Sequence, residues 1–319
     1  MKKLLLRILL LCALIYVASL PLAFLIDRGL RKSGYSPNYR EWNDIYDGRI
    51  QADLLIQGSS RAWLHFDPRL LDSALGLQTY NLGLDGFDFT LQYGRYQVYR
   101  AHNRKPAVIV QTLDYLTFRK PRDLYMLEQF IPYLSDPLLS NAISEYRGLD
   151  VRDRHIPLFK YLRRRNMALL GLRSLRIETT IDNGRYKGFQ SVHRVWDTAA
   201  VNVTTTYPPG FRFEIDSVSV LRFRSFLDTC RQEKIRVVLV YAPEFSEAGP
   251  RVANRDSVFT RYRELARDYG CEFIDYSRDP LCADTALFYN TQHLNDRGAA
   301  IFSRKLADDL QRYFSTIHR

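Results

Sequence analysis

Short apolar runs alternate with longer amphipathic stretches over most of the chain. The runs are rich in Val, Ile and Leu, and each is short enough for a buried strand. They occupy residues 53–57, 80–82, 107–113, 235–242 and 271–276. Helical patterns separate or follow them, near residues 89–103, 216–233, 252–268 and 298–316. Strands that alternate with helices predict an α/β fold with three α/β/α layers, in which a parallel five-stranded sheet is the middle layer.

The N-terminal region has another pattern, an apolar run over residues 8–26 that contains no charged side chain. At about 1.5 Å per residue, a helix of this run is about 28 Å long, close to the hydrocarbon thickness of a bilayer. We therefore expect residues 1–32 to form a cytoplasmic tip and a transmembrane anchor. A signal peptide cleaved near Val17-Ala18-Ser19 is the alternative, but the apolar run continues beyond that site.

The charges on either side of this run predict its orientation. Lys2, Lys3 and Arg7 precede it, whereas basic and acidic residues balance within residues 27–47. The positive-inside rule places the basic end in the cytoplasm. We therefore expect a single-pass protein of the inner (cytoplasmic) membrane. Its main domain, residues 50–319, is then periplasmic or otherwise extracytoplasmic.

Residues 119–212 interrupt the alternation of strands and helices. They include a helical pattern near residues 157–175 and an aromatic stretch that holds Tyr186 and Trp196. We interpret residues 119–212 as an insertion between the third and fourth strands. The insertion is either a cap beside a site or a small subdomain with a structural role.

The composition is that of a globular chain, and the charge limits its partners. Of the 319 residues, 46% are hydrophobic and 25% are charged, and the net charge is +11. Residues 147–176 carry nine basic side chains against Asp150 and Asp153. Such a stretch is typical of a solvated or membrane-facing helix surface, and an anionic lipid or polymer is the alternative partner. No nucleic-acid-binding motif accompanies it, so we expect no nucleic acid.

The cysteines and histidines give no sign of a metal site. The chain has no CxxC, HxxxH or HExxH motif, and its six histidines are scattered. We therefore expect neither a metal nor an organic cofactor.

Two polar segments follow predicted strands. Gly58-Ser59-Ser60-Arg61 comes directly after the first strand, and Asn290-Thr291-Gln292-His293 comes after the fifth. Ligands of parallel α/β sheets bind beyond the C-terminal ends of the strands, where backbone N–H groups can also face an oxyanion. A serine there is also an ordinary helix N-cap, and a single histidine is usually structural. Their joint position favours a serine–histidine site.

Four segments resemble the sequence blocks of the SGNH (GDSL-type) hydrolase superfamily. Residues 58–61 are similar to its GDS block, 81–86 to its second block, 108–114 to the strand of its third block, and 290–293 to its DxxH block. The chain is most similar to the membrane-anchored, extracytoplasmic branch that includes alginate O-acetylation proteins and the teichoic acid D-alanylation protein. The resemblance covers roughly residues 50–115 and 235–316.

This resemblance implies roles for individual residues. Ser60 is the expected nucleophile and His293 its base, and the backbone N–H groups of Ser60 and Gly86 are the expected oxyanion donors. Arg61 and Asp114 are candidate substrate contacts, although for Arg61 a role in bracing the turn is favoured. We interpret the nearby His65 as a structural loop residue.

Two positions depart from the SGNH pattern. Leu113 stands where the third block has its asparagine, so one oxyanion donor is missing. Asn290 replaces the aspartate of the DxxH block, which orients the imidazole and stabilises its charged form. The Asn290 side-chain oxygen or a backbone carbonyl could hold the ring instead, and Asp85, Asp114 or Asp296 could supply the charge.

Two functions follow from the resemblance. The first is a serine esterase or O-acyltransferase that transfers or hydrolyses an acyl (acetyl) ester on an extracytoplasmic polysaccharide. Transfer is favoured because the similar branch works with membrane-bound O-acyltransferases, which would be the partner here. The second is a catalytically inactive SGNH-like module that binds glycan or scaffolds an acylation complex, and the two departures support it.

Overall fold

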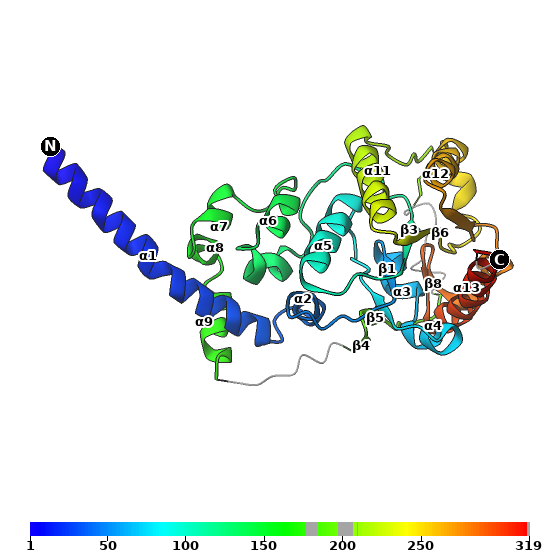
Figure 1. Cartoon of the computed structure of the whole chain (residues 1–319), viewed down its shortest axis with the longest axis horizontal. Helices are drawn as coiled ribbons and strands as arrows, with labels where there is room; N and C mark the ends of the chain where they lie inside the picture. The colour runs from blue at the N-terminus through cyan, green and yellow to red at the C-terminus, as the bar shows by residue number, and fades with distance from the viewer. Residues whose placement is uncertain (177–183, 197–206, 209, 318–319) are drawn as a thin grey trace. The chain divides into compact units, whose positions relative to one another are not determined.

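The computed structural model describes residues 1–176, 184–196, 207–208 and 210–317. Within it, the chain divides into two compact units (Figure 1). The helical unit comprises residues 1–47 and 122–183, and the sheet unit comprises residues 48–121 and 184–319.

The sheet unit is built on five strands that are all parallel, as the apolar runs predict. Their order in the sheet is β2-β1-β3-β6-β7. The strands are β1 (Leu54–Gln57), β2 (Thr79–Asn81), β3 (Val108–Leu113), β6 (Arg236–Tyr241) and β7 (Glu272–Asp275). Residues of the three central strands are almost all buried, which is why these strands read as continuous apolar runs rather than as alternating ones.

Helices cover both faces of this sheet (Figure 1). One face packs on α3 (Ser60–His65), α4 (Pro68–Leu75) and α13 (Asp296–Ile317), and the other on α5 (Phe89–His102), α11 (Ser217–Gln232) and α12 (Arg255–Tyr269). On the first face Val110 and Val240 share a buried cluster with Phe302 and Leu306 of α13. The apolar residues of α13 recur at helical spacing, so burying this stripe fixes the helix on the sheet. The α/β architecture with a parallel five-stranded sheet is thus confirmed.

The expected insertion, residues 119–212, is divided between the two units. Residues 122–183 belong to the helical unit, and residues from 184 onward belong to the sheet unit. There β4 (Arg185–Tyr186) and β5 (Phe189–Gln190) form a short hairpin beside β2, where the Asn81 N–H donates to the Lys187 carbonyl at 2.9 Å. Residues 177–183, 197–206 and 209 of the expected insertion lie outside the described residues.

The helical unit contains α1 and several shorter helices. The short helices are α2 (Tyr39–Tyr46), η1 (Leu127–Tyr133), α6 (Pro137–Ile143), α7 (Val151–His155), α8 (Phe159–Leu162) and α9 (Arg165–Ser174). The helical pattern near residues 157–175 therefore corresponds to two helices, α8 and α9, rather than one.

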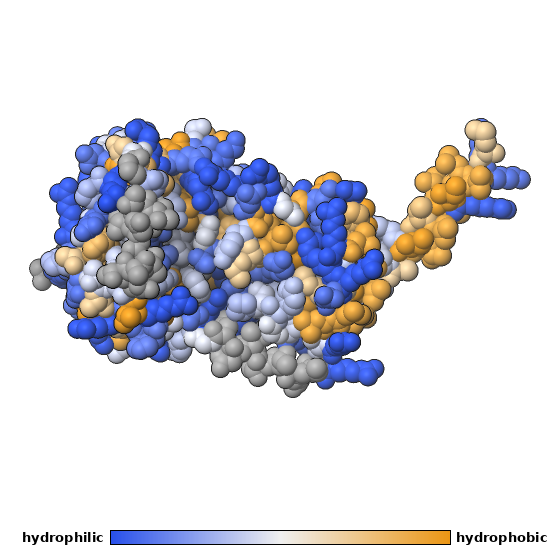
Figure 2. All heavy atoms as spheres, turned by 180° about the vertical axis from the view of Figure 1, so that it is seen from behind, coloured by the Kyte–Doolittle hydropathy of each residue, from blue (hydrophilic) through white to orange (hydrophobic). Residues whose placement is uncertain are grey.

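The first helix, α1 (Lys2–Lys32), is long and apolar enough to cross a membrane. Its N-terminal part exposes apolar side chains, which Figure 2 shows on the segment that carries the N-terminus. Its C-terminal part packs closely on α9. A Cβ atom on Gly29 would lie 1.7 Å from the carbonyl oxygen of Gly171, so this helix crossing requires glycine.

Candidate active site

The turn after β1 places Ser60 at the C-terminal edge of the sheet. Gly58 has φ = +147°, and a Cβ atom there would lie 1.7 Å from the Thr112 hydroxyl oxygen, so only glycine fits. Ser59 caps the start of α3, and its buried hydroxyl donates to the Asp114 carboxylate on the neighbouring β3 end. This pair holds the turn, and Ser60, the first residue of α3, is half-buried.

His293 reaches Ser60 from a separate hairpin near the C-terminus. The hairpin consists of β8 (Phe288–Asn290) and β9 (His293–Leu294). The Nε2 atom of His293 lies 2.7 Å from the Ser60 hydroxyl oxygen, although 233 residues separate the two in the chain. This is a short hydrogen bond between a hydroxyl and an imidazole, the arrangement in which a base can remove the proton of a serine.

Asn290 orients the imidazole. Its Oδ1 atom accepts the backbone N–H groups of Gln292 and His293, each at 2.9 Å, and lies 3.1 Å from Nδ1 of His293. Since Oδ1 can only accept, Nδ1 must carry the proton of the neutral ring. Nε2 is then unprotonated and faces the Ser60 hydroxyl as an acceptor. This tautomer is the one that a general base requires.

Two aromatic side chains enclose the imidazole. Tyr289 stacks on it with a centroid distance of 5.6 Å, and His65 meets it edge-on at 6.1 Å. His65 is the last residue of α3 and not a loop residue, because the helix continues through it. Its Nε2 accepts the Leu294 N–H at 3.0 Å, so this buried ring positions the hairpin and has the structural role expected of it.

The surroundings of His293 keep it neutral. Desolvation by the packed protein, aided by the positive charge of Arg61, lowers the pKa of His293 to about 3. No carboxylate among the described residues offsets this shift. Asp296 pairs with His193 at 2.8 Å, Asp114 is bound by Ser59, and the charge that acts on Asp85 is that of Arg185. None of the three aspartates therefore replaces the missing one.

A buried polar network lies directly behind the Ser60–His293 pair. The Arg61 guanidinium forms an ion pair with Glu244 and donates to the Tyr207 hydroxyl at 3.1 Å. The Tyr207 and Tyr241 hydroxyls donate to the same carboxylate at 3.0 and 2.8 Å. Gln292 donates to the Tyr207 hydroxyl at 3.0 Å, so the network joins α3 to the segment that carries His293.

This network corrects the expected substrate contacts. Arg61 is 1% exposed and Asp114 is 2% exposed, so neither side chain presents a polar atom to a substrate. Arg61 braces the turn after β1. Glu244 lies three residues after the end of β6, and its position just beyond a strongly apolar strand is the sequence signal for its place in this network.

The loop after β2 brings Gly86 to the same region. Leu84 N–H donates to the Gly58 carbonyl at 2.9 Å, and Gly83 lies against the backbone of Trp63 in α3. Gly86 has φ = +78°, and neither its N–H nor that of Ser60 donates to an acceptor within the described part of the chain. Both are therefore free to serve as donors. Leu113 is fully buried on β3 and offers none.

Metal ligands do not gather at this site. Over the described ranges, no group of three His, Cys, Asp or Glu side chains is placed to hold a metal ion. The chemistry that the arrangement itself supports is proton transfer from a serine hydroxyl to a neutral imidazole.

No known protein-family model matches the chain, and comparison with curated proteins gives no match either.

Proposed function

We propose that this chain is a membrane-anchored serine acyl-ester enzyme of the SGNH type. The observation that supports the proposal best is the 2.7 Å contact between the Ser60 hydroxyl and Nε2 of His293, with Asn290 fixing the tautomer. The contact joins the two segments whose sequences resemble the first and last SGNH blocks. The α/β fold with its parallel sheet agrees with that superfamily.

In the first half-reaction, the Ser60 oxygen attacks the carbonyl carbon of an acyl ester while its proton passes to Nε2 of His293. The backbone N–H groups of Ser60 and Gly86 stabilise the oxyanion of the tetrahedral intermediate. The bond from carbon to the alcohol oxygen then breaks, and His293 returns the proton to the departing oxygen. The products are an acyl ester on Ser60 and a free alcohol.

In the second half-reaction, a sugar hydroxyl or a water molecule attacks the acyl-Ser60 ester. His293 removes the proton of the attacking group and gives a proton back to the Ser60 oxygen. A sugar hydroxyl yields O-acyl transfer, and water yields ester hydrolysis. We favour transfer of an acetyl group to an extracytoplasmic polysaccharide, because the similar SGNH branch works beside membrane-bound O-acyltransferases.

The membrane anchor supports this setting. With Lys2, Lys3 and Arg7 in the cytoplasm, α1 would place the sheet unit on the periplasmic side of the inner membrane. There the enzyme would meet a glycan during its export or assembly.

A catalytically inactive, glycan-binding or scaffolding role is the second candidate. It is favoured by Leu113 at the position of the third oxyanion donor, and because His293 has no carboxylate partner in the part of the chain that the structure describes. Loss of one such donor costs about 10²–10³ in rate. An inactive module would still fold and hold its partners.

Labelling of the full-length chain in detergent micelles with a fluorophosphonate distinguishes these two functions. We expect covalent labelling of the native chain and loss of labelling in Ser60→Ala and His293→Ala. Ser225→Ala, which changes an exposed serine of α11, is the matched control and should label normally. Absence of labelling in the native chain, together with a normal fold, would support the inactive module instead.

A further inference from the structure

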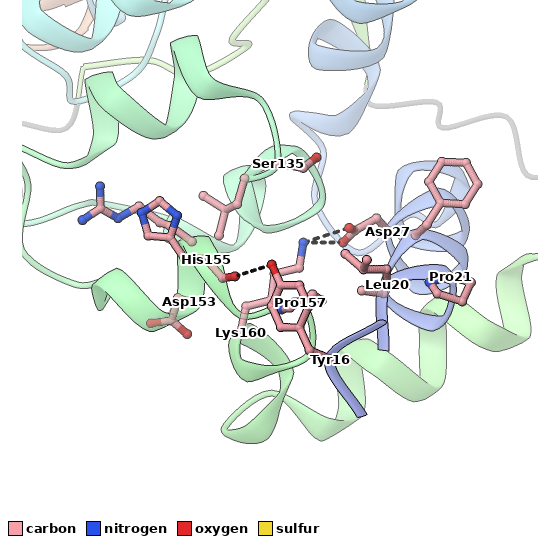
Figure 3. A pocket seen from close by; sticks show the side chains of 13 residues that line it. Tyr16, Leu20, Pro21, Asp27, Ser135, Asp153, His155, Pro157 and Lys160 are labelled. Atoms are coloured by element: carbon pink, nitrogen blue, oxygen red, sulfur yellow. Dashed lines mark hydrogen bonds and ion pairs between the residues drawn. The ribbon is translucent and has the colours of Figure 1, made fainter. Parts of the chain in front are cut away.

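Residues 155–160 of the helical unit touch α1 far inside its apolar stretch. The Tyr16 hydroxyl donates to the His155 carbonyl at 3.3 Å, a contact drawn in Figure 3. Further along α1, Lys160 forms a buried ion pair with Asp27 at 2.8 Å and also donates to the Ile131 carbonyl. These contacts attach the segment over residues 155–160 to one side of α1 from Tyr16 to Asp27.

A pocket of about 590 Å³ lies between α1 and this segment (Figure 3). Leu20, Pro21 and Phe24 of α1 line one side, and His155 and Pro157 line the other. The pocket therefore opens beside the same part of α1 that Tyr16 and Asp27 delimit.

The depth of Tyr16 follows from the length of α1. A hydrocarbon core of about 30 Å takes about 20 helical residues. A span that begins at Leu4, directly after the two N-terminal lysines, ends near Ala23 and takes in Arg7, whereas a span over the uncharged residues 8–26 ends at Ile26. Tyr16 lies about 10 Å inside the boundary of the first span and about 15 Å inside that of the second. The segment that contacts Tyr16 must therefore enter the bilayer interface.

Apolar side chains are exposed on the helices around this segment, α7, α8 and α9, as a membrane interface requires. Val151 is 56% exposed and Ile156 is 43% exposed, and α7 buries none of its residues. Leu162 and Leu169 are exposed on α8 and α9. Figure 2 shows apolar side chains next to α1 interspersed with hydrophilic ones.

Basic side chains accompany these apolar ones. Arg165, Arg173 and Arg176 are exposed on or beside α9 and form no ion pair with any residue that the structure describes. Long basic side chains can bury their alkyl stems while the charge reaches lipid headgroups. Amphipathic segments of this kind lie about 5–10 Å into the boundary between headgroups and acyl chains, the depth that the span from Leu4 gives for Tyr16.

We propose that α7, α8 and α9 of the helical unit are seated in the membrane interface, in the leaflet that holds the C-terminal half of α1. Val151 and Ile156 enter the acyl-chain boundary, and the arginines of α9 bind anionic lipid headgroups. These three helices are thus a second membrane attachment beside the transmembrane helix. The inference requires that α1 crosses the membrane but does not depend on any chemistry of Ser60.

Lipid-depth quenching of a fluorophore tests this seating. The full-length chain with Cys12→Ser and Cys271→Ser provides the background, since Cys230 and Cys282 are buried. A fluorophore is attached at Ile156→Cys, and the protein is reconstituted in vesicles of phosphatidylcholine and phosphatidylglycerol. Some of the lipids carry a nitroxide near the headgroup end of the acyl chain. We expect at least about threefold stronger quenching at this position than at Leu221→Cys, an exposed site on α11 of the sheet unit.

A label at Leu14→Cys serves as the reference inside the span and should be quenched best by a nitroxide deep in the acyl chain. Equal, weak quenching at Ile156 and Leu221 would overturn the proposal, as would an unquenched label at Leu14.

Charge reversal of Arg165, Arg173 and Arg176 to Glu should reduce quenching at Ile156 severalfold, and unchanged quenching would overturn the headgroup contact. Ser60→Ala should leave all quenching unaltered, so failure of this proposal and failure of the proposed enzyme are separable.

Discussion

The side-chain oxygen of Asn290 lies 3.1 Å from Nδ1 of His293 and accepts two backbone N–H groups of its own loop. The residue therefore performs half of the task of an aspartate at this position. It orients the ring and selects the tautomer with a free Nε2. It supplies no negative charge, so no carboxylate of the described residues stabilises the imidazolium that forms when Ser60 loses its proton.

Asn290→Asp should supply that charge. The Nδ2 group of Asn290 makes no hydrogen bond with the described residues, so replacing it by a carboxylate oxygen removes no contact. In serine proteases the opposite exchange costs about 10⁴ in kcat, and a gain of about 10²-fold in acyl-ester turnover is expected here. The measurement is kcat for an aryl acetate with the full-length chain in micelles, compared with the native chain and with Asn290→Ala.

The pH profile of this variant gives an independent check. The pKa of His293 is about 3 in the native chain, so turnover should be independent of pH between about 5 and 8. A carboxylate at position 290 favours the charged ring and should raise the inflection toward the ordinary histidine value. An unshifted profile together with unchanged turnover would show that the carboxylate does not reach the ring.

The sequence predicted the scaffold of this site well. Each of the five strands lies within one or two residues of its apolar run. For the central strands β1, β3 and β6 the reason is burial on both faces of the sheet, which requires a nearly continuous apolar run. Ser60 and His293 were predicted to meet because both follow such strands, and parallel strands end at one sheet edge. The chemistry-bearing positions could therefore be located without knowing any contact.

The network behind the site could not be predicted in the same way. Arg61 meets Tyr207 and Glu244, which lie 146 and 183 residues away in the chain. No local pattern encodes such a meeting. The hairpin of β4 and β5 was missed for another reason, since strands of two residues are too short to show a period of two.

The buried Arg61–Glu244 pair predicts a large effect of removing one partner. Arg61→Met should lower the free energy of unfolding by about 3–5 kcal/mol, because it leaves the Glu244 carboxylate buried without its cation. Arg61→Met combined with Glu244→Gln should recover part of this loss. Urea unfolding of the full-length chain in micelles measures the free energy of unfolding of both variants. A double variant that is less stable than Arg61→Met would contradict the buried ion pair between Arg61 and Glu244.

The two histidines of the site predict a loss of stability in acid. Burial lowers the pKa of His65 and of His293 below the ordinary value near 6.5, so below pH 6.5 the unfolded chain binds protons that the native chain excludes. The stability is therefore complete above pH 6.5 and decreases as the pH falls, by up to about 1.4 kcal/mol per pH unit for each histidine.

His65→Gln isolates one of these contributions, because the glutamine oxygen can still accept the Leu294 N–H. The slope of unfolding free energy against pH, measured between pH 6.5 and 5, should be smaller in His65→Gln than in the native chain. His102→Gln, at an exposed histidine, is the matched control and should keep the native slope. Equal slopes in the two variants would argue against a neutral, buried His65.

The crossing of α1 and α9 predicts a defect that leaves the candidate active site untouched. In Gly29→Ala the new methyl group would lie 1.7 Å from the Gly171 carbonyl oxygen, and since that atom belongs to the backbone, the two helices must separate. We expect the free energy of local opening of α9 to fall by about 1–3 kcal/mol. Trypsin should then cleave at Arg165 or Arg173 about tenfold faster or more. Gly34→Ala, whose methyl group would meet nothing within 4 Å, is the matched control and should be cleaved at the native rate. Fluorophosphonate labelling of Ser60 should be the same in the native chain and in both variants. Equal cleavage of the two variants by trypsin would mean that α9 does not pack on α1 at this glycine pair.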